Sequence, residues 1–221
     1  GFAAGNIDGT RAIVAATAPG TRFVHVSSLS AREPRLSIYG WSKREAEEIV
    51  AASALAWDMV RPPGIYGPGD MEMLDVFRLA RRGFSITPPA GRASWIHVDD
   101  LARLLVVLAE TPAERAIYEM DDGREGGWTH HAFAQAVGVA LGRPIRPLAL
   151  TPGLLRLGAR IDRLIRGKRA KLTADRVAYF CHPDWTVDPA KRPPVALWTP
   201  GIASEAGLRE TAESYRAAGL L

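Results

Sequence analysis

Apolar residues recur along this chain in two alternating patterns, short β-branched runs and longer amphipathic stretches. Residues 6–18 have the apolar spacing of a helix, and the run 22–26 has the composition of a buried strand. Residues 37–56 predict a second helix and residues 57–61 a second strand, which two prolines end at once. This strand–helix–strand order predicts a right-handed parallel βαβ unit.

The pattern after residue 61 favours helices over strands. The expected elements are a Gly/Pro loop over 65–70, a helix over 72–82, a strand over 95–98, a helix capped by Asp99 or Asp100 that reaches Glu110, a strand over 116–120, and helices over 129–141, 152–166, 173–180 and 205–217. The chain therefore predicts an α/β fold with a mainly helical C-terminal part.

Composition narrows the class of protein. The chain has 221 residues, 47% of them hydrophobic, and its longest apolar run, Leu104–Ala109, is too short to span a membrane. Its single cysteine, Cys181, excludes an internal disulfide framework and a cysteine-based zinc site and fits a reducing cytoplasm. The net charge of +4 comes almost entirely from arginine, so we predict no nucleic-acid partner. The adjacent His130 and His131 point in different directions, so no metal site is predicted.

The residues best suited to chemistry lie near the start of the helix over 37–56. Tyr39 and Lys43 are four residues apart and share one helix face, where the lysine cation would lower the pKa of the phenol. Ser27 and Ser28 end the preceding strand, where α/β proteins bind ligands and where a hydroxyl could hold a substrate oxygen. A tyrosine and a lysine at this spacing also occur by chance as surface residues, so the pair alone leaves both interpretations open.

Five segments in order over residues 6–110 resemble the extended short-chain dehydrogenase/reductase family, also described as NAD-dependent epimerases and dehydratases. They are Asn6-Ile7-Asp8-Gly9-Thr10, Val26-Ser27-Ser28, Tyr39-Gly40-Trp41-Ser42-Lys43, Arg61-Pro62-Pro63-Gly64-Ile65-Tyr66-Gly67-Pro68-Gly69-Asp70 and Trp95-Ile96-His97-Val98-Asp99-Asp100-Leu101-Ala102. The resemblance implies a Rossmann-like, doubly wound parallel sheet. It assigns residues 1–120 to the dinucleotide-binding domain, with 65–92 contributing to the substrate lobe, and 121–221 to substrate binding.

The resemblance also implies roles for individual residues. Tyr39 would exchange a proton with the substrate oxygen, and Lys43 would lower the tyrosine pKa and bind the nicotinamide ribose. Ser28 would hold the substrate oxygen, with Ser27 as the alternative if the register slips by one residue. The backbone of Pro63, Gly64 and Ile65 would lie against the nicotinamide of NAD or NADP. Asn6 is either near the cofactor or a structural kink, and His97 and Asp100 are expected to hold a strand–helix junction.

Two features depart from the family pattern. The glycine-rich turn that binds pyrophosphate would precede Asn6, so we expect roughly the first third of a complete relative to lie outside this sequence. The residue that selects NAD or NADP would lie there too. An arginine that contacts the nucleotide in sugar epimerases matches Ala93 here, with Arg92 one residue away as the candidate substrate-binding residue. This mismatch and a short loop between Ser28 and Tyr39 favour a substrate other than a nucleotide sugar.

The stretch 154–171 combines apolar and basic residues. Leu154, Leu157, Ile161, Leu164 and Ile165 share one helical face, and Arg156, Arg160, Arg163, Arg166, Lys168, Arg169 and Lys171 lie on the other side or just beyond. Such a helix suits a membrane surface or an amphiphilic substrate, or it packs in the core with a solvated arginine face. The stretch resembles the 3β-hydroxysteroid dehydrogenase-like and bacterial ceramide reductase branches of the family.

The leading hypothesis is therefore an NAD(P)-dependent oxidoreductase that acts on a small hydrophobic or lipid-like carbonyl or alcohol. One alternative is a nucleotide-sugar epimerase or dehydratase that uses the same serine, tyrosine and lysine with bound NAD. Another is a non-catalytic accessory subunit that kept the fold. The resemblance further implies a homodimer through the Tyr39–Lys43 helix, and the expected location is the cytoplasm or the membrane surface.

Overall fold

The computed structural model describes residues 1–167, 170 and 172–221, which form two units with interleaved chain segments. The first unit consists of Gly1–Pro63, Leu101–Met120 and Val187–Thr199. The second consists of Gly64–Asp100, Asp121–Thr186 and Pro200–Leu221. The assignment of substrate binding to residues 121–221 stays a prediction.

A parallel sheet forms the centre of the first unit. Its strands are β1 (Arg22–Val26), β2 (Ala56–Arg61) and β7 (Ile117–Glu119), in the order β1–β2–β7. Val26 pairs with Val60, and Met59 pairs with Ile117, so the carboxyl ends of all three strands lie at one edge. The predicted strands and their parallel pairing are confirmed.

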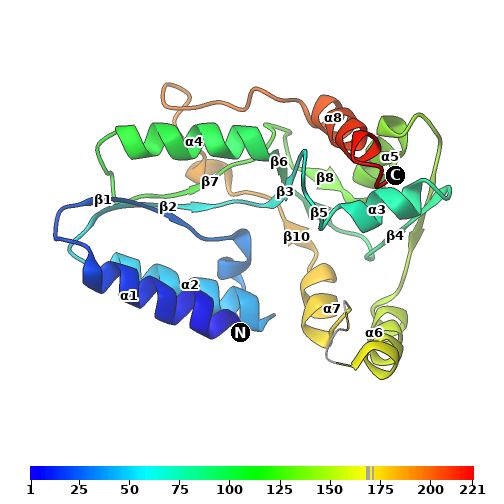
Figure 1. Ribbon diagram of the computed structural model, residues 1–221, viewed down its shortest axis with the longest axis horizontal. Coiled ribbons are helices and arrows are strands. Elements are labelled where there is room, and N and C mark those ends of the chain that lie inside the picture. The colour runs from blue at the N-terminus through cyan, green and yellow to red at the C-terminus, as the bar shows by residue number, and fades with distance from the viewer. Residues whose placement is uncertain (168–169, 171) are drawn as a thin grey trace. The chain divides into compact units, whose positions relative to one another are not determined.

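Helices cover both faces of this sheet. The π-helix η1 (Ala3–Asp8) continues into α1 (Gly9–Ala16), which lies with α2 (Ile38–Ala51) on one face, and α4 (Val98–Glu110) lies on the other (Figure 1). Val50, Trp57 and Met59 form a buried cluster between α2 and β2. Two 3₁₀ helices, η2 (Leu29–Arg32) and η4 (Pro189–Lys191), complete the unit. The predicted Rossmann-like, doubly wound α/β fold is confirmed.

Short strands and five helices build the described part of the second unit. The strand pairs are parallel β3 (Gly64–Tyr66) with β6 (Trp95–His97), parallel β4 (Phe84–Thr87) with β9 (Arg146–Ala149), and β5 (Arg92–Ala93) between parallel β10 (Asp184–Trp185) and antiparallel β8 (Trp128–Thr129). The helices are α3 (Leu74–Ala80), α5 (His130–Ala140), α6 (Pro152–Arg166), α7 (Ala174–Phe180) and α8 (Ser204–Ala217).

Aromatic side chains dominate the core of the second unit. Trp95 stacks on Phe133 with ring centroids 3.9 Å apart, and the ring of Tyr66 is fully buried against them. His97 and Asp100 are also fully buried, and the Asp100 carboxylate accepts hydrogen bonds from the backbone of the segment that leads into α8. These contacts fit the predicted role of His97 and Asp100 at a strand–helix junction.

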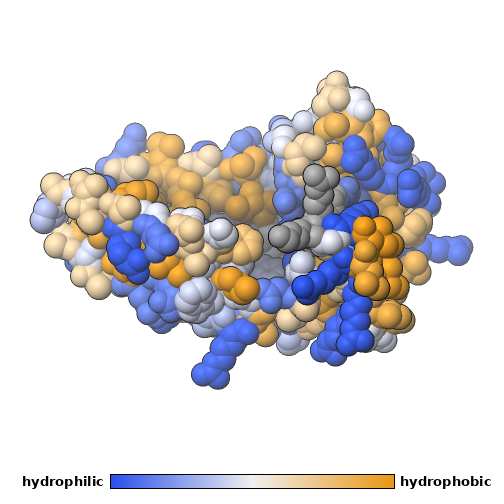
Figure 2. All heavy atoms as spheres, turned by 60° about the horizontal axis from the view of Figure 1, so that its bottom comes forward, coloured by the Kyte–Doolittle hydropathy of each residue, from blue (hydrophilic) through white to orange (hydrophobic). Residues whose placement is uncertain are grey.

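Helix α6 packs differently from the core-packed alternative. Leu155 and Ala159 are buried against Val177 of α7, whereas the five apolar residues predicted to share a face (Leu154, Leu157, Ile161, Leu164 and Ile165) stay exposed. Figure 2 shows a hydrophobic strip beside hydrophilic side chains over this helix. Lys168, Arg169 and Lys171 lie outside the described residues.

Several predicted boundaries differ from the structure. The helix expected over 37–56 ends at Ala51, because Ala56 already pairs in β2. The loop expected over 65–70 was wrong in its first part, since Gly64–Tyr66 forms β3. Strands of two to four residues, such as β5 and β8, were not predicted, because a run this short has no measurable periodicity and depends on distant partners.

Candidate active site

The segment after β1 runs along the end of β2. The backbone N–H of Ser27 donates to the Val60 carbonyl at 2.8 Å, and the N–H of Leu29 donates to the Pro62 carbonyl at 3.1 Å. Ser28 lies between these two bonds, at the carboxyl edge of the sheet where α/β folds bind ligands. The sheet register therefore places the predicted serine at the expected edge.

Ser27 and Ser28 have different hydrogen-bond partners. The Ser28 hydroxyl caps η2 by accepting the backbone N–H of Ser30 at 3.2 Å, and it also forms a hydrogen bond with Tyr39. The buried Ser27 hydroxyl donates to the Glu47 carboxylate at 2.5 Å. Ser27 is thus held by a structural partner, which supports Ser28 as the substrate-facing hydroxyl.

The start of α2 positions Tyr39 and Lys43 one turn apart. Ser37 caps the helix by accepting the backbone N–H of Gly40 at 2.9 Å. A Cβ atom at Gly40 would lie 2.6 Å from the Ser30 carbonyl oxygen, so only glycine allows α2 to approach η2 this closely. The close approach brings the Tyr39 hydroxyl to Ser28.

The environment of Tyr39 keeps its phenol protonated. Burial raises the pKa of Tyr39, and the hydrogen bond with Ser28 opposes this shift only in part. The ring of Phe2 packs edge-on against it with centroids 5.2 Å apart. The prediction that Lys43 lowers this pKa was wrong for the structure as it stands: the pKa is raised, because burial of the phenol outweighs the opposing contribution.

Lys43 lies beside the tyrosine ring and points toward the end of β1. Its ammonium group is 5.9 Å from the Tyr39 ring centroid and donates to the Val26 carbonyl at 3.1 Å. Burial lowers the pKa of Lys43, while the negative charge of Glu47, one turn further along α2, raises it. Glu47 therefore favours the charged form of the lysine.

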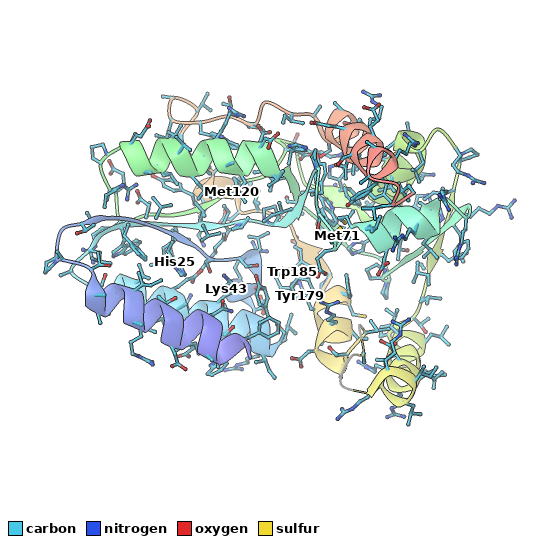
Figure 3. The ribbon with its side chains drawn as sticks, in the orientation of Figure 1. His25, Lys43, Met71, Met120, Tyr179 and Trp185 are labelled. Atoms are coloured by element: carbon cyan, nitrogen blue, oxygen red, sulfur yellow. The ribbon has the colours of Figure 1, made fainter. Side chains whose placement is uncertain are left out.

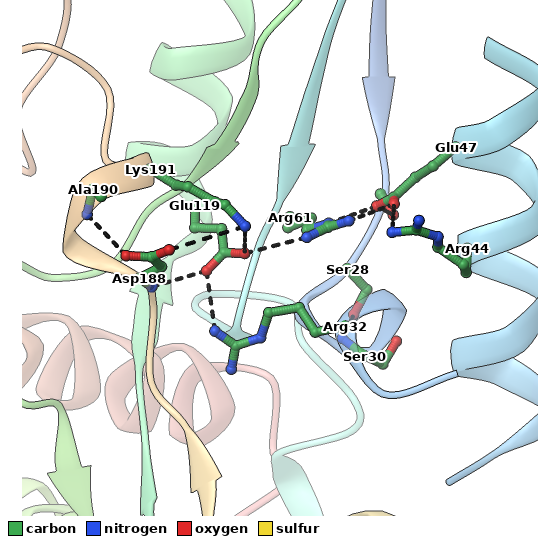
Figure 4. Close-up of polar contacts among 11 residues, drawn as sticks. Ser28, Ser30, Arg32, Arg44, Glu47, Arg61, Glu119, Asp188, Ala190 and Lys191 are labelled. Carbon is green, nitrogen blue, oxygen red and sulfur yellow. Dashed lines mark hydrogen bonds and ion pairs between the residues drawn. The ribbon is translucent and has the colours of Figure 1, made fainter. Parts of the chain in front are cut away.

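A buried chain of ion pairs begins at Glu47 (Figure 4). Arg61, on β2, donates to both Glu47 carboxylate oxygens, through Nε at 2.8 Å and Nη2 at 2.7 Å. The same guanidinium donates through Nη1 to Glu119 of β7 at 3.5 Å. All three side chains are almost completely buried. Two carboxylates around one guanidinium satisfy its fork of donors and connect α2, β2 and β7 at the carboxyl edge.

Glu119 also has hydrogen-bond and ion-pair partners in other segments of the first unit. Its Oε2 accepts from Arg32 at 3.2 Å and from the backbone N–H of Asp188 at 2.9 Å, and Lys191 lies 3.9 Å from Oε1. Sequence analysis did not identify Glu47, Arg61 or Glu119. The available signals were the four-residue spacing from Lys43 to Glu47 and an arginine ending an otherwise apolar strand, but neither shows that the charges are buried.

Asn6 lies within the π-helix η1. Its side-chain amide donates to the Ser42 hydroxyl at 2.9 Å, and Ser42 donates to the Tyr39 carbonyl at 2.8 Å. Since π-helical turns are rare and occur often at functional sites, the structure supports the kink at Asn6 and connects it to α2. A direct role of Asn6 in cofactor binding stays a prediction.

His25 was not predicted as a site residue, yet it lies with Lys43 between β1 and α2 (Figure 3). Its pKa is lowered to about 4 by burial and by the Lys43 cation, with Glu47 acting in the opposite direction. The Nε2 atom is buried and has no hydrogen-bond partner among the described residues. His25 is therefore a neutral group beside the lysine.

The predicted cofactor-contacting backbone follows β2. Pro63 closes the first unit at the carboxyl edge, and Gly64 and Ile65 begin β3 in the second unit. A Cβ atom at Gly64 would lie 2.4 Å from the Trp95 ring, which gives this glycine a packing role. The guanidinium of Arg92 donates to the backbone carbonyls of Gly126 and Gly127. Contact of these residues with cofactor or substrate stays a prediction.

The donors at the sheet edge fit the ribose of a nicotinamide dinucleotide. Lys43 has three N–H donors, and the bond to Val26 is its one hydrogen bond in the part of the chain that the structure describes. Tyr39 adds a half-buried hydroxyl one turn away. A ribose offers two adjacent hydroxyls, so Tyr39 and Lys43 are the residues that would hold it, with the Pro63 backbone beside the nicotinamide.

Residues 1–167, 170 and 172–221 contain no group of three or more His, Cys, Asp or Glu side chains that is arranged to hold a metal ion. Within the same residues, no helix has the length and apolar character needed to cross a membrane.

Comparisons with known proteins identify the family of the chain. Residues 2–120 match the model of the NAD dependent epimerase/dehydratase family. A ceramide reductase of Caulobacter vibrioides (strain NA1000 / CB15N) is 38% identical over 100% of this chain and 71% of the relative.

Solved structures show the same fold at lower identity. The human epimerase family protein SDR39U1 with NADPH is 18% identical, with a TM-score of 0.71 over 94% of this chain and 72% of that protein. The protein gox2253 is 17% identical, with a TM-score of 0.75 over 98% of this chain and 73% of its own. MoeE5 in complex with UDP-glucuronic acid and NAD is 19% identical, with a TM-score of 0.62 over 96% of this chain and 71% of that protein. The chain thus belongs to the NAD dependent epimerase/dehydratase family and is an NAD(P)-dependent oxidoreductase of the short-chain dehydrogenase/reductase type.

Proposed function

We propose that this protein reduces a ketone on a lipid-like substrate, with Tyr39 as the proton donor. The observation that carries the proposal is the hydrogen bond between Ser28 and Tyr39 at the carboxyl edge of the sheet, with Lys43 one turn further along α2. The name of the Caulobacter relative, ceramide reductase, supports a lipid substrate.

The proton transfer follows from the state of the tyrosine. Because burial raises the Tyr39 pKa, the phenol holds its proton at neutral pH and is ready to donate it to a carbonyl oxygen. Ser28 would hold the same oxygen by a hydrogen bond. When bound, the nicotinamide supplies the hydride, which adds to the carbonyl carbon as the Tyr39 proton adds to the oxygen, giving an alcohol.

Lys43 would stabilise the tyrosinate that remains after transfer. Its ammonium group lies beside the Tyr39 ring, and the negative charge of Glu47 favours its protonated form against the effect of burial. The hydrogen bond to the Val26 carbonyl orients the ammonium group. The lysine thus has a fixed position before any cofactor binds.

Arg92 bears on the choice of substrate. Its guanidinium donates to the Gly126 and Gly127 carbonyls, so part of its donor set is used within the second unit. This arrangement supports a lipid-like substrate over a nucleotide sugar.

A location at the membrane surface belongs to the same proposal. The homodimer through α2 is proposed from the family resemblance, and the cytoplasmic location is proposed from the single cysteine.

The direct test is turnover of the ketone form of ceramide by the purified protein with NADPH or NADH, followed by the loss of reduced nicotinamide. We expect Tyr39→Phe to lower kcat by about a hundredfold or more, because the proton donor is lost. Tyr118→Phe is the matched control, since it removes a tyrosine hydroxyl from β7 in the same unit and should leave kcat unchanged.

Other outcomes separate the alternatives. Turnover of a nucleotide sugar that Arg92→Ala abolishes, without turnover of the ketolipid, would establish the epimerase or dehydratase function instead. Dinucleotide binding with no turnover of either substrate class would indicate a non-catalytic subunit. Reduction of the ketolipid by Tyr39→Phe at the wild-type rate would exclude Tyr39 as the acid.

A further inference from the structure

Helix α6 has three distinct faces. Its N-terminus is well formed, because Thr151 accepts the Leu154 N–H and Pro152 occupies the first turn. Successive residues rotate by about 100° around a helix axis, so each face can be followed along the sequence. Leu155 and Ala159 form the buried face against Val177 of α7. This face packs α6 against α7.

The second face is an apolar stripe in contact with solvent. Leu164 and Ile165 are 85% and 77% exposed, and Leu154, Leu157 and Ile161 are 47 to 53% exposed. These five residues span about 100° of the helix circumference. Exposing so many large aliphatic side chains on one helix is unfavourable in water and marks an interaction surface.

The third face carries arginines between the buried and apolar faces. Arg156, Arg160 and Arg163 line a cavity of about 580 Å³ together with Ala159, Leu172 and neighbouring residues. None of the three arginines has an ion-pair partner in the described part of the chain, whereas Arg166 pairs with Asp162 at 3.3 Å. Three unneutralised guanidinium groups therefore lie directly beside the apolar stripe.

We propose that α6 docks on the surface of a lipid bilayer that contains anionic phospholipids. The apolar stripe would enter the boundary of the acyl chains, and the arginine face would bind headgroup phosphates, for which a guanidinium is well suited. The bilayer is the occupant that matches both faces at once. The inference goes beyond the proposed reaction and would hold for a protein with another substrate.

Charge argues against other occupants of this surface. If two copies of the chain joined through their α6 stripes, the arginine faces would be brought near each other without a matching carboxylate, since Asp162 already pairs with Arg166. A nucleic acid would bind the arginines but would leave the five aliphatic side chains in water.

Co-sedimentation of the purified protein with vesicles tests the proposal. We expect binding to vesicles of phosphatidylglycerol mixed with phosphatidylcholine, weaker binding to phosphatidylcholine alone, and a decrease as salt rises. The double substitution Leu164→Glu with Ile165→Glu and the substitution Arg160→Glu should each weaken binding by about tenfold or more. All three side chains are solvent-exposed, so these variants should keep the wild-type thermal unfolding curve.

Val195→Glu is the matched control, because Val195 is equally exposed but lies in the first unit. It should bind vesicles like the wild type. Wild-type binding by the Leu164/Ile165 variant, or no binding by the wild type, would overturn the proposal. Two further results would do the same: inorganic phosphate alone saturating the arginine face without any effect of the apolar substitutions, or a dimer in sedimentation analysis that the double substitution dissociates.

Discussion

At the scale of single residues, the candidate active site depends on how burial and neighbouring charges set protonation. Burial raises the pKa of Tyr39 and lowers the pKa of Lys43, and Glu47 opposes the shift of Lys43 in part. Burial and the Lys43 cation lower the pKa of His25, which is therefore neutral. Three titratable groups within two adjacent elements thus have pKa values shifted toward their neutral forms, and shifted pKa values cluster at functional sites.

His25 predicts a pH dependence of stability. Its pKa is 6.5 in the unfolded chain and about 4 in the folded protein, so between these values the unfolded state binds more protons. The stabilising contribution is complete above the unfolded pKa and is lost as the pH falls through the folded pKa. The shift corresponds to about 3 kcal/mol of unfolding free energy.

Urea unfolding of wild type and His25→Gln from about pH 7 to about pH 4.5 checks this prediction. The variant lacks the titrating group, so its unfolding free energy should fall less steeply with acidification than that of the wild type. The carboxylates titrate in both proteins and cancel in the comparison. Parallel curves would show that His25 titrates alike in the folded and unfolded states.

At the scale of elements, close backbone approach and buried charge hold the sheet edge together. Gly40 allows α2 to approach η2, and Arg61 connects the carboxylates of α2 and β7. The first contact joins neighbouring elements, and the second joins elements that are distant in sequence. Both contacts help to fix the position of α2, which carries Tyr39 and Lys43.

Gly40→Ala should lower stability and activity together. Alanine usually stabilises a helix interior by about 1 kcal/mol relative to glycine, but here its Cβ would lie 2.6 Å from the Ser30 carbonyl oxygen. The control is Gly158→Ala in α6, where the added Cβ would lie at an ordinary 3.5 Å from Leu172 and should be neutral or stabilising. Thermal melts of the two variants measure the difference, and an equal gain in both would contradict the close approach.

Arg61→Met should be strongly destabilising. The substitution leaves the Glu47 and Glu119 carboxylates buried without their shared guanidinium, and breaking a buried pair in this way costs about 3 to 5 kcal/mol. Arg11→Met removes an exposed partner of Asp8 and should cost about 0.5 kcal/mol or less. Denaturant midpoints of the two variants test the prediction. Similar losses would mean that the buried chain of ion pairs adds little.

At the scale of the whole molecule, the two units are built from interleaved segments. The first unit takes Val187–Thr199 from late in the sequence, and this segment supplies Asp188 and Lys191 to Glu119. The polar neighbours of β7 therefore come from the far end of the chain. A continuous piece of sequence does not contain a complete first unit.

A fragment of residues 1–120 should consequently be less stable than the same residues in the full chain. It keeps β1, β2 and β7 but loses the Asp188 N–H and the Lys191 ammonium that neutralise and satisfy Glu119. Limited proteolysis and circular dichroism would detect the loss of cooperative folding. A fragment that unfolds at the full chain's midpoint would show that residues 187–199 are dispensable for the first unit.

Local patterns predicted much of this protein before any contact was known. The β-branched run at 22–26 and the amphipathic stretch at 152–166 became β1 and α6, because apolar spacing is set by the period of the element itself. The motif from Tyr39 to Lys43 fell at the start of α2, as predicted. The ends of α2 and the start of β3 were wrong, since strand pairing with distant segments overrode local helix and turn preferences.

The sequence alone was enough to predict the main helices and the strands of the central sheet, the four-residue spacing of Tyr39 and Lys43, and the family. Only the tertiary structure decided that Glu47, Arg61 and Glu119 are buried together, that the Tyr39 pKa rises, and that the α6 stripe faces solvent. The physical reason is the distance along the sequence over which each kind of contact acts. Periodicity and spacing express contacts within one element, whereas desolvation and ion pairing depend on which distant elements come to surround a side chain.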